Sequence, residues 1–168
     1  MNIILIGFMG SGKSTIGRLL AKALKMNFLD TDELIEKTEG RKIAQIFKKD
    51  GENYFRDLET EVLKTLGDYD NFVLATGGGM VLREENAALL KLMGPRILLW
   101  AEARVIYDRI KTQAHRPLLQ VKNPRARIQK ILDYRRPFYE GVANFSIDGS
   151  RLNPDQTAGE IIKWLKSS

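Results

Sequence analysis

An eight-residue segment near the N-terminus has the residue types and spacing that hold a polyphosphate. Residues 7–14 read Gly-Phe-Met-Gly-Ser-Gly-Lys-Ser and satisfy every fixed position of the pattern G-x-x-x-x-G-K-[ST]. Glycines let backbone N–H groups approach an anion closely, and the helix that follows presents its positive N-terminal end. We expect the Lys13 ammonium to reach the β- and γ-phosphates of a nucleotide and the Ser14 hydroxyl to bind Mg²⁺. The other nucleotide contacts expected from this loop are Gly10, Ser11, Gly12 and Thr15.

Two aspartates that follow the next apolar run are candidates for metal and acceptor chemistry. Asp30 and Asp32 lie two residues apart on a segment expected to leave a strand. Alternate residues of an extended chain point the same way, so both carboxylates can enter one cleft. One could hold Mg²⁺ through water, and the other could orient or deprotonate an acceptor hydroxyl. The alternative is that one of them is simply the N-cap of the following helix.

Three consecutive glycines follow a further apolar run. Gly77, Gly78 and Gly79 would carry an entropic cost inside a helix or strand. We expect them to form a backbone surface that donates N–H groups to a small substrate packed against it. The alternative is a flexible turn before the next helix.

An arginine and a glutamate occur at helical spacing in the middle of the chain. Arg56 and Glu59 stand at i and i+3, on one face of an expected helix. Glu59 could fix the guanidinium, which would then offer a fork of donors to a substrate carboxylate. The alternative is an ordinary surface ion pair.

Composition limits the classes of protein to which the chain can belong. Its 168 residues suggest one domain, residues 1–168, and the sequence contains no cysteine. The formal net charge is +6, and residues 104–136 hold ten basic and two acidic side chains. We expect a polyphosphate ligand and no nucleic acid, because the basic residues lack the interleaved aromatic platform that stacks on bases. No apolar stretch is long enough for a bilayer and the N-terminus lacks a charged leader, so we expect a cytoplasmic protein without membrane contact.

Short apolar runs alternate with stretches of helical spacing along the whole chain. Strands are expected at residues 2–6, 27–29, 72–75, 96–100 and 144–147, and helices at residues 13–25, 31–38, 43–50, 53–66, 83–93, 103–112, 124–139 and 154–166. This alternation predicts an α/β fold, a parallel sheet covered on both faces, with ligands at the carboxyl ends of the strands. Residues 31–66 are long for a crossover and should form a helical subdomain beside the phosphates. Residues 113–123 have weak periodicity and are predicted to be a mobile loop.

Together these motifs resemble those of shikimate kinase, a family that phosphorylates the 3-hydroxyl of shikimate with ATP in aromatic amino-acid biosynthesis. The resemblance covers essentially the whole chain and rests on residues 7–14, 30–32, 51–59, 76–79, 116–119 and 135–139. It implies the three-layer P-loop kinase fold of nucleoside monophosphate kinases, with five parallel strands in the order 2-3-1-4-5 flanked by helices. It also implies a monomer. Two alternatives remain: a related small-molecule kinase such as gluconate kinase, and a non-catalytic P-loop nucleotide-binding regulator.

The resemblance implies roles for matching residues on the nucleotide side. Lys13 and Ser14 would hold the phosphates of ATP and Mg²⁺, with Asp30 assisting the metal through water. Arg109 and Pro154 are similar to the pair that sandwiches adenine in the family.

On the acceptor side, the resemblance implies that Asp32 binds the substrate hydroxyls and acts as a base or orienting group. Arg56 and Arg135 would clamp the shikimate carboxylate beside the three glycines, next to the helical subdomain. Arg116, within a lid at residues 113–123, would reach over the transferring phosphate. The residues implied to be catalytic are Asp32, Lys13 and Arg116.

Overall fold

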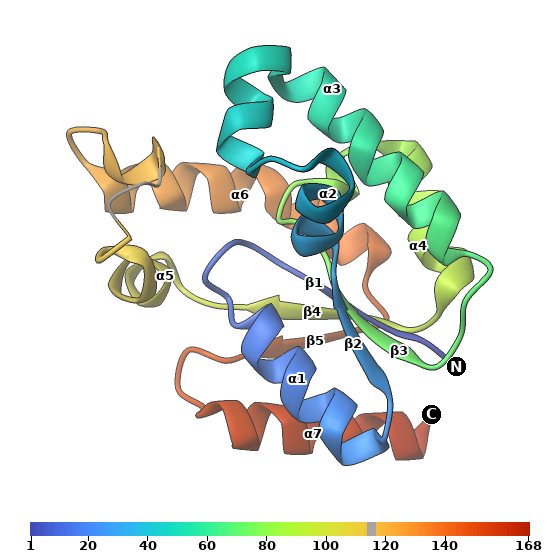
Figure 1. Cartoon of the computed structure of the whole chain (residues 1–168). Coiled ribbons are helices and arrows are strands. Elements are labelled where there is room, and N and C mark those ends of the chain that lie inside the picture. The colour runs from blue at the N-terminus through green and yellow to red at the C-terminus, as the bar shows by residue number, and fades with distance from the viewer. Residues whose placement is uncertain (114–116) are drawn as a thin grey trace.

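Five short strands form one parallel sheet in the order β2-β3-β1-β4-β5, as the resemblance implied (Figure 1). The computed structural model describes residues 1–113 and 117–168. Its strands are β1 (Ile3–Ile6), β2 (Asn27–Asp30), β3 (Phe72–Ala75), β4 (Arg96–Trp100) and β5 (Phe145–Asp148). All four residues of the central strand β1 are buried, because helices cover both faces of the sheet.

Within the described residues, seven α-helices lie close to where the sequence places them. They are α1 (Lys13–Leu24), α2 (Thr31–Glu39), α3 (Ile43–Leu66), α4 (Glu84–Met93), α5 (Ala103–Ile110), α6 (Pro124–Val142) and α7 (Pro154–Ser167). Two 3₁₀ turns, η1 (Met80–Leu82) and η2 (Pro117–Leu119), were not predicted, and η2 lies within the expected loop at residues 113–123. None of the described helices combines the length and apolar character needed to span a membrane.

Alternate residues of the strands build two separate apolar cores. Ile3 and Leu5 of β1 pack in one core with side chains of α1 and α7, which lie together on one face of the sheet (Figure 1). Ile4 and Ile6 pack in the other core, with side chains of α3, α4 and α6 on the opposite face. The two-residue period of a strand therefore fixes which helices cover each side of the site at the strand ends.

Helix α3 is two helical segments that meet at a glycine. Gly51 has φ 84° and ψ 178°, a conformation that L side chains rarely adopt. The expected break between residues 50 and 53 is therefore confirmed, although both segments belong to one continuous element. Ile35 of α2 packs with Ile46 and Phe55, one from each segment of α3, in a small core apart from the sheet.

A close approach between α1 and β2 yields a stability prediction. A Cβ at Gly17 of α1 would lie 2.5 Å from Cε2 of the Phe28 ring on β2, whereas a Cβ at Gly159 of α7 would meet open space. Gly17→Ala should destabilise the protein by about 1–3 kcal/mol through overpacking. The matched change Gly159→Ala should stabilise it by about 0.5–1 kcal/mol through helix propensity. Urea unfolding of both variants measures the difference, and a Gly17→Ala protein as stable as Gly159→Ala would contradict the close packing.

Candidate active site

The loop between β1 and α1, residues 7–14, is called the phosphate loop below. Gly7 and Gly12 of this loop have conformations or contacts that exclude a side chain. A Cβ at Gly7, where φ is 145°, would overlap the backbone oxygen of Leu99 on β4. Gly12 is the N-cap of α1 with φ 101°. The Lys13 ammonium lies against the loop and donates to the backbone oxygens of Gly7 at 2.6 Å and Phe8 at 2.8 Å. The loop thus presents backbone N–H groups and a lysine at the positive end of α1.

Of the two residues expected to sandwich adenine, Arg109 contacts this loop. The Arg109 guanidinium is exposed and donates to the backbone oxygen of Gly10 at 3.0 Å. Pro154 is the first residue of α7 and is exposed. The loop after β5 is tied to the start of α5 by the Glu102 N–H, which donates to the Ser150 hydroxyl at 2.9 Å. Arg116 lies outside the described residues.

The Asp30 carboxylate caps α2, the alternative considered from the sequence, and it also contacts the phosphate loop. Its Oδ1 accepts from the backbone N–H of Asp32 at 2.9 Å and so caps α2. Its Oδ2 accepts from the Ser14 hydroxyl at 2.9 Å and so faces the phosphate loop. The cap fixes the carboxylate, which leaves its second oxygen beside the serine hydroxyl.

Asp32 faces the three glycines, residues 77–79, here called the glycine strip. A Cβ at Gly77 would lie 3.1 Å from Oδ1 of Asp32 and 2.7 Å from Oε1 of Glu59. The Gly77 N–H donates to the buried Thr31 hydroxyl at 2.9 Å, which ties the end of β3 to the start of α2. The strip therefore runs between two carboxylates that belong to different helices.

Glu59 is buried and Arg56 is mostly buried, so the alternative of an ordinary surface ion pair is wrong. Glu59 is fully buried, and its Oε2 lies 2.7 Å from Nη1 of Arg56. The pKa of Glu59 is raised to about 7: burial is the main cause, Arg56 opposes the rise, and the nearby charge of Asp32 adds to it. Glu52, on the exposed side, lies 3.4 Å from Nη2 of Arg56. The guanidinium is consequently held from two sides.

Arg56 and Arg135 both lie against the glycine strip. A Cβ at Gly79 would overlap the Arg56 guanidinium, and a Cβ at Gly78 would lie 3.5 Å from Nη1 of Arg135. The same Gly78 position is 3.3 Å from the backbone nitrogen of Met9 in the phosphate loop. Charged groups occupy the space that side chains of the strip would need. A turn that was merely flexible would not require such free space, so the three glycines are more than a flexible turn.

Two polar residues of this region were not assigned a role from the sequence. Thr31 lies between the two aspartates and holds Gly77, and Tyr139 donates its hydroxyl to the Gly78 backbone oxygen at 2.6 Å. Tyr139 follows Arg135 by four residues on α6, so helical spacing was the available signal.

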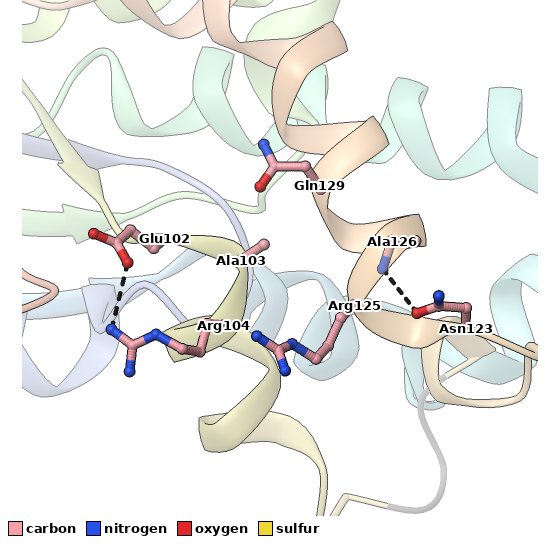
Figure 2. A pocket seen from close by; sticks show the side chains of 7 residues that line it. All are labelled: Glu102, Ala103, Arg104, Asn123, Arg125, Ala126 and Gln129. Carbon is pink, nitrogen blue, oxygen red and sulfur yellow. Dashed lines mark hydrogen bonds and ion pairs between the residues drawn. The ribbon is translucent and has the colours of Figure 1, made fainter.

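A separate hollow of about 630 Å³ lies between α5 and α6. Figure 2 shows its lining side chains, with Arg104 on α5 and Arg125 on α6 on either side of it. Arg104 is engaged by Glu102 at 3.4 Å. No lining residue belongs to the phosphate loop or the glycine strip, so this hollow is not the candidate active site.

The fold and the site define the class of P-loop kinases: a phosphate loop between β1 and α1, with acidic and basic side chains at the neighbouring strand ends. Residues 9–166 match the family model described as shikimate kinase. A shikimate kinase of Thermodesulfovibrio yellowstonii is 49% identical over 96% of this chain and 93% of its own, and one of Caldanaerobacter subterraneus is 44% identical over 96% and 94%.

Solved structures agree with this match. The chain superposes with a TM-score of 0.94 on shikimate kinase from Acinetobacter baumannii in complex with shikimate, at 39% identity, covering 99% of this chain and 93% of the other. For shikimate kinase from Aquifex aeolicus the TM-score is 0.86 at 41% identity, covering 99% and 96%. The chain belongs to the shikimate kinase family.

The raised pKa of Glu59 predicts a specific pH dependence of stability. The unfolded chain releases this proton near pH 4.5, whereas the folded protein holds it up to about pH 7. Stability from this group is therefore complete below pH 4.5 and is lost as the pH rises toward 7. The free energy of unfolding of the wild type, relative to Glu59→Gln, should fall across this window and be flat above it.

Denaturant titrations at several pH values measure this difference, because the other titrating groups cancel between the two proteins. Glu61→Gln, an exposed glutamate of the same helix, is the control and should show no such slope. A difference between wild type and Glu59→Gln that does not change from pH 4.5 to 7 would contradict the buried, proton-holding state.

Proposed function

We propose that the chain transfers the γ-phosphoryl group of ATP to the 3-hydroxyl of shikimate. One observation carries the proposal: Asp32, Arg56 and Arg135 converge on the glycine strip, and the strip adjoins the phosphate loop at Met9. Shikimate has a carboxylate at one end of a small ring and hydroxyls at the other. An arrangement of two cations and one carboxylate along a side-chain-free backbone is complementary to such a molecule.

We assign the carboxylate of shikimate to the two arginines, called the carboxylate clamp below. Glu59 neutralises part of the Arg56 charge and fixes its guanidinium at 2.7 Å. Among the described residues no carboxylate forms an ion pair with Arg135, whose guanidinium lies 5.5 Å from the centre of the Phe8 ring. The clamp therefore has a net positive charge for an anionic ligand, and planar guanidinium groups suit a carboxylate.

The acceptor hydroxyl is assigned to Asp32. In the transfer, a bond forms between this hydroxyl oxygen and the γ-phosphorus as the bond from phosphorus to the β,γ-bridging oxygen breaks, and the hydroxyl proton passes to the Asp32 carboxylate. Lys13 and the backbone N–H groups of the phosphate loop stabilise the negative charge on the phosphoryl oxygens. The protein's contribution is mainly positioning and charge stabilisation.

The corner formed by Ser14 and Asp30 fits Mg²⁺. Both supply hard oxygen atoms, and Asp30 is already oriented by its cap, so a hydroxyl and a water-mediated carboxylate are available. Mg²⁺ takes few protein ligands, because it completes its shell with phosphate oxygens and water. When bound with ATP, the metal would neutralise charge on the β- and γ-phosphates.

The remaining assignments rest on the family resemblance. We propose that residues 31–66 are the substrate-binding subdomain, that residues 113–123 with Arg116 close over the transferring phosphate, and that Arg109 and Pro154 sandwich adenine. We also propose a cytoplasmic monomer. The position of Arg109 against the phosphate loop supports its part in this set.

A coupled assay of ADP release tests the proposed function. Shikimate should start turnover in the presence of Mg²⁺ and ATP, whereas gluconate and buffer alone should not. Faster turnover with gluconate would favour the related-kinase alternative. Nucleotide binding without turnover on either acceptor would favour a non-catalytic regulator and would overturn the proposal.

Neighbouring arginines on α6 provide a matched test of the clamp. Arg135→Gln should raise the KM for shikimate by roughly tenfold to a hundredfold, since a charged hydrogen bond contributes about 1.5–3 kcal/mol. The KM for ATP should stay nearly constant. Arg136→Gln is the control, because Arg136 is exposed and pairs with Glu140 at 2.8 Å. A rise in the KM for ATP with an unchanged KM for shikimate would show that Arg135 serves the nucleotide.

The acceptor base is tested by removing one charge. Asp32→Asn keeps the side-chain shape but loses the proton acceptor, and kcat should fall by roughly 10²–10⁴-fold with the fold intact. Glu33→Gln changes the next residue of the same helix, which is exposed and pairs with Arg18 at 3.2 Å, and it should be nearly neutral. Initial rates and circular dichroism of both variants are the measurements. Normal turnover in a folded Asp32→Asn protein would remove Asp32 from the catalytic residues.

A further inference from the structure

Tyr139 is a buried aromatic residue whose hydroxyl reaches the candidate active site. It lies on α6 in the apolar core that α3, α4 and α6 form against the sheet, and only 1% of its surface is exposed. A buried tyrosine hydroxyl needs a hydrogen-bond partner, and the rigid aromatic ring fixes the position of the hydroxyl. The partner is the Gly78 backbone oxygen at 2.6 Å, sixty-one residues away in the sequence.

The same hydroxyl is also a neighbour of the carboxylate clamp. The Arg135 side chain, one helical turn before Tyr139 on α6, lies beside the glycine strip, with its Nη1 3.5 Å from the Cβ position of Gly78. The charges of both Arg135 and Arg56 act on this oxygen and oppose the rise in its pKa that burial causes. One oxygen atom thus contacts the glycine strip, and the charges of both arginines of the clamp act on it.

The contacts around Gly78 leave little freedom for adjustment. A Cβ at Gly78 would lie 3.3 Å from the backbone nitrogen of Met9 and 3.5 Å from Nη1 of Arg135. The peptide of Gly78 is therefore bounded by the phosphate loop and the guanidinium on one side and by the tyrosine hydroxyl at its carbonyl. These contacts set the distance between the glycine strip and the Arg135 guanidinium. A ligand that lies on the strip and binds Arg135 through its carboxylate must match this distance.

We propose that Tyr139 is a positioning residue for the carboxylate clamp: its hydroxyl holds the peptide of Gly78, the residue against which the Arg135 guanidinium lies. The assignment rests on the proposed function, because it requires Arg135 to bind the substrate carboxylate. Tyr139 itself does not touch the reacting atoms. Its removal should therefore weaken acceptor binding and leave the phosphoryl-transfer step and the nucleotide site nearly unchanged.

Tyr139→Phe keeps the buried ring and removes only the hydroxyl. The KM for shikimate should rise about threefold to tenfold, since one hydrogen bond to a charged or buried group is lost. The kcat and the KM for ATP should change by less than about twofold. Tyr134→Phe is the matched control on the same helix, because Tyr134 is 65% exposed, and it should alter none of these values.

A double-mutant cycle separates positioning from mere packing. If Tyr139 acts through Arg135, adding Tyr139→Phe to Arg135→Gln should raise the KM for shikimate little beyond the effect of Arg135→Gln alone. Additive effects, or an unchanged KM in a folded Tyr139→Phe protein, would overturn the assignment while shikimate-dependent turnover of the wild type still supported the function. Wild-type protein without that turnover would overturn the proposed function and this assignment together.

Discussion

The space along the backbone of residues 77–79 is the constraint on which the site depends. A side chain at any of these three positions would meet a charged group: two carboxylates at Gly77, the Arg135 guanidinium at Gly78 and the Arg56 guanidinium at Gly79. These groups come from the neighbouring helices α2 and α3 and from α6, which lies much later in the sequence. The glycine strip is the one surface that all of them share, and its Gly78 peptide also adjoins the phosphate loop. Filling that space would separate the acceptor site from the phosphates.

The electrostatics of the site follow from this crowding. Burying Glu59 beside Asp32 is unfavourable for its ionised form, which is why its pKa rises to about 7 despite the contact with Arg56. The arrangement keeps Arg56 in one orientation and lowers its net charge, while Arg135 has no ion-pair partner among the described carboxylates. A fixed guanidinium and an uncompensated one together suit an anionic group better than two mobile surface arginines would, because less side-chain entropy is lost on binding.

Local patterns in the sequence predicted the fold and the phosphate loop, because strand and helix periods and the glycine spacing are local properties. The break in α3 lies at Gly51, between the two helical stretches expected at residues 43–50 and 53–66. The burial of the Arg56–Glu59 pair was not predictable from its i, i+3 spacing, since burial depends on where the end of β3 packs against that helix. The hydrogen bond of Tyr139 was not predictable for a similar reason. Its spacing indicates a core position, but the partner of its hydroxyl lies in a loop sixty-one residues earlier. The sequence also did not show that Asp30 both caps α2 and contacts Ser14. The two contacts use different oxygens of one carboxylate, so neither excludes the other.

The most direct test of the account is a crystal structure of the protein with shikimate and ADP bound. The account predicts the shikimate carboxylate within hydrogen-bonding distance of the Arg56 and Arg135 guanidinium groups, its ring along residues 77–79, and a ring hydroxyl at the Asp32 carboxylate facing the phosphate loop. A shikimate molecule seated elsewhere, or one whose carboxylate points toward the phosphate loop with its hydroxyls on the arginines, would contradict it.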